Sequence, residues 1–426
     1  MKLLVSQFLA RLAKRILAKY QPIVFAITGS IGKTSARDAI FAVVSQKYRA
    51  RASAKSFNNE LGLPLTIIGI STPPEKNILR WVHIFARAIF SILFHANYPE
   101  VLVLELGIDH PGEMDMLLDI ANPSIGVLTS IGVSHYQFFE NSAQIENEKA
   151  KIATHLPAGG FFLVNADSDT ALRQQTKTLA GVVTFGFNPD AQVHPEQITE
   201  SLSGKFSSHL KIKLLSGSIE ATVKAVGKPH ITAVLAGVAA GSVLKIEHDL
   251  IIKGVETYKP HPGRLHIIGG IKRSIIIDDS YNASSPESVL EGIALLSRIP
   301  ALFKIAVIGD MLELGSLSDE KHEEVGQKVA GGHFDRLVTV GAQARIIASA
   351  AKAGGMDAAK IISFDSSDEA KKTVQELIEL ESAVLVKGSQ GVRMEKITKE
   401  IMAEPMRAQE LLCRQYGKWL EVKKRT

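Results

Sequence analysis

Short apolar runs alternate with helical stretches along most of the chain, and this alternation constrains the fold more than any other feature. Four runs rich in valine, isoleucine and leucine lie in the first half, at 23–28, 101–106, 125–132 and 161–167. Runs that are apolar on both faces are typical of parallel strands buried between two layers of helices. The pattern therefore predicts an α/β fold with a parallel-rich sheet.

The same rhythm returns in the second half of the chain. Five apolar runs follow one another there, SIIIDD, KIAVIGD, RLVTVG, KIISFD and AVLVKG. Between the two series, residues 181–228 are more polar and alternating, which predicts a few antiparallel strands. The segment KPHPG at 259–263 is the best candidate for a domain boundary, because proline and glycine interrupt regular structure there. We expect two α/β domains, the second Rossmann-like.

Composition narrows the class of protein. With 426 residues, 46% hydrophobic and 22% charged, the chain is an ordinary globular protein of two or three domains. A net charge of +5 is a mild excess that suits anionic small molecules as well as nucleic acid or lipid. The one cysteine, Cys413, excludes an internal disulfide framework and a cysteine-rich zinc site. We expect a cytoplasmic monomer that acts on small molecules and not on nucleic acid.

Two segments could be mistaken for membrane signals. Residues 1–20 carry an apolar stripe at helical spacing, at Leu4, Phe8, Leu12 and Ile16. This amphipathic helix either docks on the protein body or lies on an anionic membrane surface, so a peripheral membrane contact through 1–20 stays open. The segment 81–94 is too short to span a bilayer and carries His83 and Arg87, which predicts a buried or surface-docked helix.

The stretch VFAITGSIGKTS at 24–35 predicts a phosphate-binding loop. A strand, a glycine-rich turn and a helix follow one another, so backbone N–H groups and the helix N-terminus would bind phosphate oxygens. Lys33 would reach the β- and γ-phosphates and Thr34 would offer its hydroxyl to Mg²⁺. We expect ATP and Mg²⁺ as cofactors, with a cradle made by Thr28, Gly29, Ser30, Ile31, Gly32, Lys33, Thr34 and Ser35.

Three ionisable residues follow further along this half. Glu105 ends a buried strand, where a carboxylate needs either a metal-bound nucleotide or a lysine or arginine as its partner. His135 follows another strand end and is either a metal ligand or a histidine with an ordinary structural role. Lys149 sits in an otherwise polar helix, which predicts a solvated position.

Polar residues also follow strands in the second half. Asp278 and Asp279 could hold ribose hydroxyls or metal, and Arg264 could reach phosphate. Ser285 and Pro286 indicate a helix start. A later strand-end loop offers donors for an anionic substrate, at Lys387, Ser389 and Arg393.

Taken together, these motifs resemble those of the Mur ligases, from about residue 24 to about 401. The resemblance rests on TGSIGKTS, NNELGLPLT at 58–66, LELG with PGEM, IGVSH, a lysine seven residues before Leu156, DDSYNASSPES, GDMLELG and VLVKGSQGVRME. GDMLELG favours the branch that adds D-alanyl-D-alanine to the UDP-N-acetylmuramoyl tripeptide. The signature of the diaminopimelate-adding branch does not occur in the sequence.

The resemblance implies an ADP-forming amide ligase of peptidoglycan precursor synthesis, and so of cell-wall biogenesis, cell shape and division. A carboxylate would attack the γ-phosphate of ATP to give an acyl phosphate, which an amine then displaces. It also implies three units: an N-terminal amphipathic helix at 1–22, a central ATP-binding domain at 23–260 and a C-terminal ligase domain at 261–426.

Site roles are carried over from the resemblance residue by residue. Lys33, His135 and Lys149 would be catalytic, Lys149 as a carbamylated lysine. Metal would be shared by Thr34, Glu105, His135 and Lys149. The nucleotide would also bind Arg264, Asp279, Tyr281 and Asn282. Substrate would bind Asn58, Asn59, Lys387, Ser389 and Arg393.

Three departures from the family pattern affect details. Only some 22 residues precede the phosphate-binding loop, where the family carries a UDP-binding domain of about 100 residues. Ser130 stands where the family has asparagine, and Ala233 stands where an adenine-reading asparagine is expected. Two rival hypotheses follow: a Mur-like ligase with another acceptor, such as a lipid-linked or poly-γ-glutamate substrate, and a catalytically inactive ATP-binding scaffold.

Overall fold

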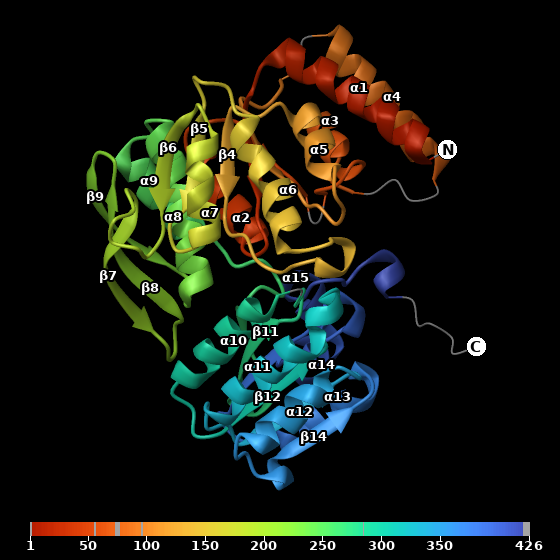
Figure 1. The fold of residues 1–426 in the computed structure, drawn as a ribbon, viewed down its shortest axis with the longest axis vertical. Coiled ribbons are helices and arrows are strands. Elements are labelled where there is room, and N and C mark those ends of the chain that lie inside the picture. The colour runs from red at the N-terminus through yellow and green to blue at the C-terminus, as the bar shows by residue number, and fades with distance from the viewer. Residues whose placement is uncertain (1, 55–56, 73–76, 95–96, 284, 421–426) are drawn as a thin grey trace.

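Six parallel strands form the sheet of the N-terminal half, in the upper part of Figure 1. The computed structural model describes residues 2–54, 57–72, 77–94, 97–283 and 285–420. The strands lie in the order β2-β3-β1-β4-β5-β6, and every neighbouring pair is parallel. Their bounds are Ile23–Thr28 (β1), Ala50–Ala52 (β2), Val101–Glu105 (β3), Ile125–Leu128 (β4), Phe161–Asn165 (β5) and Gly181–Phe185 (β6).

Helices cover both faces of this sheet. Phe25 and Ile27 of β1 pack into one core with α2 (Lys33–Val44), α8 (Lys228–Val243) and α9 (His248–Thr257). Val24 and Ala26 point to the other core, which contains α1, α3, α5 and α6. These helices are α1 (Lys2–Tyr20), α3 (Gly62–Ile68), α5 (Glu113–Ala121) and α6 (Ser142–Thr154). The apolar runs are thus buried on both faces, as expected for strands between two helix layers.

A small antiparallel sheet closes the far side of the first core. Its strands β7 (His194–Ser201), β8 (Ser207–Leu214) and β9 (Gly217–Val223) pair in that order. Alternate residues of β8, among them Leu210 and Ile212, are buried in the core that holds α8. The antiparallel strands predicted for 181–228 are confirmed for β7, β8 and β9, but the prediction was wrong for β6, which pairs parallel with β5 in the main sheet.

The C-terminal half has its own six-stranded sheet, in the lower part of Figure 1, in the order β10-β11-β15-β12-β13-β14. All pairs are parallel except β10 with β11. The strands are His266–Gly269 (β10), Ile275–Asp279 (β11), Lys304–Gly309 (β12), Arg336–Val340 (β13), Ile361–Phe364 (β14) and Ala383–Lys387 (β15). The helices are α10 (Pro286–Arg298), α11 (Ser318–Ala330), α12 (Ala344–Ala353), α13 (Ser367–Leu377), α14 (Glu395–Ile401) and α15 (Ala408–Leu411).

The predicted fold class is confirmed, and two strands were not anticipated. β2 has three residues and β10 has four, too few for a run of side chains to reveal a period. The helix start at Ser285 and Pro286 is confirmed, with Ser285 as the N-cap of α10. The limits 22/23 and 260/261 of the three units stay predictions.

Helix α1 docks on the N-terminal half. Its apolar face is buried against α3, α4 (Ile78–Leu93) and α5, with Leu9, Ala13 and Ile16 fully covered. The docked interpretation of 1–20 is therefore correct for residues 5–20. Helix α4 lies beside α1 at the upper edge of Figure 1 and is surface-docked. Within the residues that the structure describes, no helix is long and apolar enough to cross a membrane.

We predict that Ile16→Ala lowers the free energy of unfolding by about 2–5 kcal/mol, since it leaves a cavity under α1. Chemical unfolding monitored by circular dichroism measures the change. The neighbouring exposed residue gives the control: Arg15→Ala should change stability by no more than about 0.5 kcal/mol. Equal stability of the two variants would mean that α1 does not dock.

Candidate functional site

A cavity of about 2150 Å³ lies between the two halves of the molecule. Its walls include the turn after β1 and the end of β3 on one side, and the loops after β11 and β15 on the other. The carboxyl ends of both parallel sheets therefore open into one space. Crevices at such strand ends are where open α/β sheets bind ligands.

The turn between β1 and α2 has the backbone of a phosphate cradle. Gly29 and Gly32 have φ values of 149° and 85°, and a Cβ on Gly29 would lie 2.1 Å from Thr129 Oγ1. Ser130 Oγ accepts a hydrogen bond from Ile31 N at 2.9 Å, so serine at this position supports the turn. The Lys33 ammonium donates to Gly29 O at 2.5 Å. Residues 30–34 line the cavity at the N-terminus of α2, whereas Thr28, Gly29 and Ser35 do not line it.

The Glu105 carboxylate lies at the floor of this cradle and is 4% exposed. It accepts hydrogen bonds from Thr34 Oγ1 at 3.0 Å and Asn58 Nδ2 at 3.2 Å, and it pairs with Arg37 at 3.3 Å. Arginine is thus one of the partners that a buried carboxylate requires. The hydroxyl of Thr34 and the carboxylate are also the hard oxygen donors that Mg²⁺ prefers.

Protein side chains alone do not form a complete metal site. In the described part of the chain, no group of three or more His, Cys, Asp and Glu side chains could hold a metal ion. Mg²⁺ usually keeps several waters and binds through one or two carboxylates together with substrate phosphates. Thr34 and Glu105 beside an anion cradle fit that mode of binding.

Lys149 is buried, and the prediction of a solvated position was wrong. Its side chain on α6 is 2% exposed, and its Nζ has no hydrogen-bond partner in the described structure. Burial, reinforced by the positive charge of Lys33, lowers the pKa of Lys149 to about 7. The polar composition of α6 misled because Glu148 is buried too, and accepts hydrogen bonds from Gly112 N and Met114 N at the start of α5.

His135 joins the two halves across the cavity. Its Nδ1 lies 2.7 Å from Glu313 Oε2 and 3.4 Å from Asp109 Oδ1, and Gln137 N donates to Glu313 O at 3.2 Å. Glu313 lies in the loop after β12, so one carboxylate of the C-terminal half holds the imidazole. A role of His135 in metal binding stays a prediction.

The wall opposite the cradle carries Arg264, Tyr281 and Asn282. The guanidinium of Arg264 stacks on the Tyr281 ring at 4.3 Å, and its buried Nε lacks a hydrogen-bond partner among the described residues. A buried donor without a partner costs free energy, which an anionic group in the cavity would recover. Across the cavity from a phosphate cradle, these residues fit a nucleotide.

Several predicted residues lie elsewhere. Asp279 and Lys387 do not line the cavity but form a buried ion pair of 2.6 Å, and Lys387 is 1% exposed. Asp278 is buried beside Thr398, which donates to it at 3.1 Å, and burial raises the pKa of Asp278 to about 6. Roles of these three residues in ligand binding stay predictions. The remaining substrate candidates line the cavity: Asn58, Asn59, Ser389 and Arg393.

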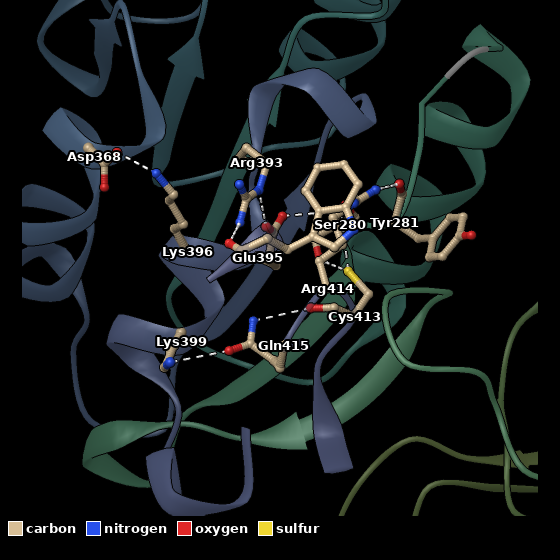
Figure 2. A network of polar contacts seen from close by, with 11 residues as sticks. Ser280, Tyr281, Asp368, Arg393, Glu395, Lys396, Lys399, Cys413, Arg414 and Gln415 are labelled. Atoms are coloured by element: carbon tan, nitrogen blue, oxygen red, sulfur yellow. Dashed lines mark hydrogen bonds and ion pairs between the residues drawn. The ribbon is translucent and has the colours of Figure 1, made fainter. Parts of the chain in front are cut away.

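The C-terminal segment contributes residues that sequence reasoning missed. Arg414 stacks on Tyr281 at 5.2 Å and on Trp419 at 5.6 Å, while Arg393 stacks on Trp419 at 5.0 Å. Figure 2 shows Glu395 between Arg393 and Arg414, at 2.5 Å and 3.1 Å. Arginines and aromatic rings therefore alternate from Arg264 to Arg393 along the cavity wall. Local sequence near the end of the chain carries no signal for this stack, because its members meet only through folding.

Comparison with known proteins gives two family matches. Residues 88–241 match the Mur ligase middle domain, and residues 263–390 match the Mur ligase, glutamate ligase domain. The UDP-N-acetylmuramoyl-tripeptide–D-alanyl-D-alanine ligase of Bacillus subtilis is 30% identical over 402 residues, covering 93% of this chain and 80% of that relative. The enzyme of the same name from Escherichia coli is 27% identical over 381 residues, covering 89% and 76%.

Solved structures of Mur ligases have the same fold. MurF from Acinetobacter baumannii is similar with a TM-score of 0.78 and 24% identity, covering 94% of this chain and 80% of that chain. MurF ligase from Thermotoga maritima in complex with ADP has a TM-score of 0.76 and 25% identity, covering 93% and 83%.

We predict that Lys387→Met lowers the free energy of unfolding by about 3–5 kcal/mol, because it leaves the Asp279 charge buried without its partner. The double variant Asp279→Asn/Lys387→Met should recover a large part of the loss, since it removes the uncompensated charge. Urea unfolding measures both. A single variant as stable as the parent protein would show that Lys387 does not stabilise the fold through this pair.

Proposed function

This chain belongs to the Mur ligase family, and we propose that it is an ATP-dependent ligase that joins D-alanyl-D-alanine to the UDP-N-acetylmuramoyl tripeptide. The substrate carboxylate attacks the γ-phosphorus of ATP, which gives an acyl phosphate and ADP. The amine of the dipeptide then attacks the acyl carbon, loses a proton, and phosphate leaves. The observation that carries the proposal is one cavity with a glycine cradle on one wall and Arg264, Tyr281 and Arg393 on the other. The curated relatives named above carry this activity in their names.

ATP binds, in this proposal, with its phosphates on the turn 29–34 and its remaining parts toward Arg264, Tyr281 and Asn282. Backbone N–H groups at the N-terminus of α2 would hold the phosphates, and the Lys33 ammonium would leave Gly29 O for the transferring group. Burial lowers the pKa of Lys33, so its charge must be balanced, and Glu105 and the phosphates supply that balance.

Mg²⁺ fits between the cradle and Glu105. Thr34 and Glu105 would hold it together with the nucleotide phosphates, and the ion would neutralise charge that develops on the transferred phosphoryl group. Glu105 would keep its contact with Arg37, which orients the carboxylate. His135, whose imidazole contacts Glu313, would be a further metal ligand at the edge of the cavity.

Lys149 would be carbamylated. A buried amine with a pKa near 7 is about half neutral at neutral pH, and a neutral amine is the form that adds CO₂. The addition gives a carbamate and one proton, and it converts an unpartnered cation into an anion next to Lys33. In the unmodified side chain the buried Nζ has no hydrogen-bond partner in the described structure. The carbamate would remove this unpaired ammonium and place an anion beside the Lys33 charge.

The acceptor is an anion and the dipeptide carries a carboxylate, and the cavity offers both of them cations. Arg393 is held by Trp419 and by Glu395, which Arg414 binds in turn, so Glu395 and Arg414 would position the guanidinium of Arg393. Asn58, Asn59 and Ser389 would add neutral donors. A monomer that encloses its own cavity suffices for this chemistry. The membrane contact that the sequence left open for 1–20 is not required, since Leu12 and Ile16 of the apolar stripe are buried inside the protein and only Phe8 among its described members is exposed.

Formation of ADP is the direct test. We predict ADP formation with ATP and Mg²⁺ only when both the UDP-N-acetylmuramoyl tripeptide and D-alanyl-D-alanine are present, with a product heavier by the dipeptide. Lys33→Ala should lower the rate about a hundredfold or more, because it removes a charge that stabilises the transition state. Lys47→Ala, in the turn that follows the C-terminus of the same helix, is the matched control.

Other outcomes of this assay separate the rival hypotheses. ADP formation that requires a lipid-linked or amino-acid substrate instead would replace the proposed acceptor. ATP binding without turnover on any of these substrates would favour a scaffold. Turnover that survives Lys33→Ala would overturn the assignment of the cradle.

Carbamylation of Lys149 has its own test. We predict a carbamate carbonyl signal in the NMR spectrum of the native protein with isotopically labelled bicarbonate, increasing as the pH rises through about 7, where the amine loses its proton. Lys149→Met should remove the signal, and Lys151→Met, two residues along the same helix and partly exposed, should keep it. A spectrum of the parent protein without that signal would contradict the assignment.

A further inference from the structure

Helix α4 has two apolar faces, and only one of them packs on the protein. Ile84, Ala88 and Ser91 are buried against the body, with Trp81 and Phe85 partly covered. The opposite face is exposed: Leu79 is 75% exposed and Leu93 is 69% exposed. At 100° per residue the exposed apolar side chains form one continuous outer stripe, made by Ile78, Leu79, Val82, Ile89, Phe90 and Leu93.

Helix α1 extends this stripe. Phe8 is 47% exposed, and its ring packs on Phe85 at 5.5 Å. At the other end, the Lys19 ammonium donates to the carbonyls of Ser91, Ile92 and Phe94 and so caps α4. The two helices lie side by side at one edge of the molecule (Figure 1). We call the outer stripe of α4, with Phe8 and the exposed Phe94, the α1/α4 surface.

Helices α1 and α4 themselves carry charged side chains of one sign only, while Asp119 of α5 pairs with Lys14 of α1 at 2.6 Å. Neither 2–20 nor 78–93 contains an aspartate or a glutamate. Arg80, His83 and Arg87 are exposed and follow one another at helical spacing, in a row beside the apolar stripe. Arg11 and Arg15 are exposed on α1, and Arg15 lies two turns from Phe8 on the same face. An apolar stripe flanked by arginines is complementary to an anionic lipid surface.

We propose that the α1/α4 surface docks this protein on an anionic membrane, with α4 in the plane of the interface. Its outer side chains would enter the boundary of the acyl chains, and the flanking arginines would meet lipid phosphates. A helix of 16 residues is too short to cross a bilayer but suits this orientation. The proposal differs from a contact through residues 1–20 alone. Most apolar side chains of α1 are buried against the protein, so the exposed apolar face that would meet the membrane belongs mainly to α4.

A second copy of this chain is a poorer occupant. In a two-fold dimer the same patch meets itself, so the arginines of one copy would face those of the other across an apolar contact. A membrane offers phosphates instead. Docking also leaves the site accessible, since none of the described residues that line the cavity belongs to α1 or α4.

Vesicle flotation of the full chain tests the proposal. We expect binding to vesicles of phosphatidylcholine with phosphatidylglycerol, weaker binding to phosphatidylcholine alone, and loss of binding in high salt, which screens the arginines. Leu79→Ser/Leu93→Ser should weaken binding about tenfold or more, because two inserted side chains are lost. Arg11→Gln/Arg15→Gln should weaken binding to the anionic vesicles by about tenfold as well.

Matched control variants distinguish binding through the α1/α4 surface from nonspecific binding of exposed leucines or cations. Leu302→Ser/Leu380→Ser removes two exposed leucines from the C-terminal half, and Lys328→Gln/Lys352→Gln removes two exposed cations there. Both variants should bind the anionic vesicles as strongly as the parent chain does. All substituted residues are exposed, so the melting temperature should not change. No binding to any vesicle, or equal loss in the C-terminal variants, would overturn the proposal. A concentration-dependent dimer that Leu79→Ser/Leu93→Ser dissociates, without vesicle binding, would replace the membrane by a second copy.

Discussion

The arrangement of the site depends on the buried carboxylate of Glu105. Its oxygens bind Thr34 and Arg37 of the helix after the cradle and Asn58 of the next loop. A buried charge is expensive unless it is paired and hydrogen-bonded, so these three side chains are held to the end of β3 by the cost of leaving the carboxylate alone. One residue thereby fixes the cradle, the candidate metal oxygens and a cavity-lining asparagine relative to one another.

The two halves of the molecule are linked mainly by polar contacts at the cavity, although Val226 of the N-terminal half is buried in the core of the C-terminal half. His135 meets Glu313 across the cavity, and the stack that begins at Arg264 and Tyr281 continues through the C-terminal segment to Arg393. Apolar side chains on the two sides belong to separate clusters for most of their members. Domains joined mainly through polar contacts can move relative to each other, as closure over a nucleotide would require.

Composition alone did not determine burial at two helices. Helix α6 is polar, yet Lys149 and Glu148 lie inside the protein, where the lysine loses much of its basicity. Helix α4 is mostly apolar, yet one of its apolar faces is exposed. The period of a helix predicts which residues share a face, but it does not tell what covers that face. The lowered pKa of Lys149 follows from the protein that covers it, and the proposed docking of α4 follows from the absence of cover on its outer face in the described structure.

The sequence by itself determined the α/β class, the glycine-rich turn between a strand and a helix, and the family, because apolar periodicity and a strand–glycine–helix motif are local signals. It also showed that most candidate residues directly follow predicted strands. Because the strands are parallel, their carboxyl ends lie at one edge of each sheet. Only the tertiary structure decided that Lys387 forms a buried pair with Asp279, that Arg37 neutralises Glu105, and that Trp419, stacked on the buried Arg414, reaches the cavity wall. These contacts join residues far apart in the chain, and their energies depend on burial, which a local pattern does not contain.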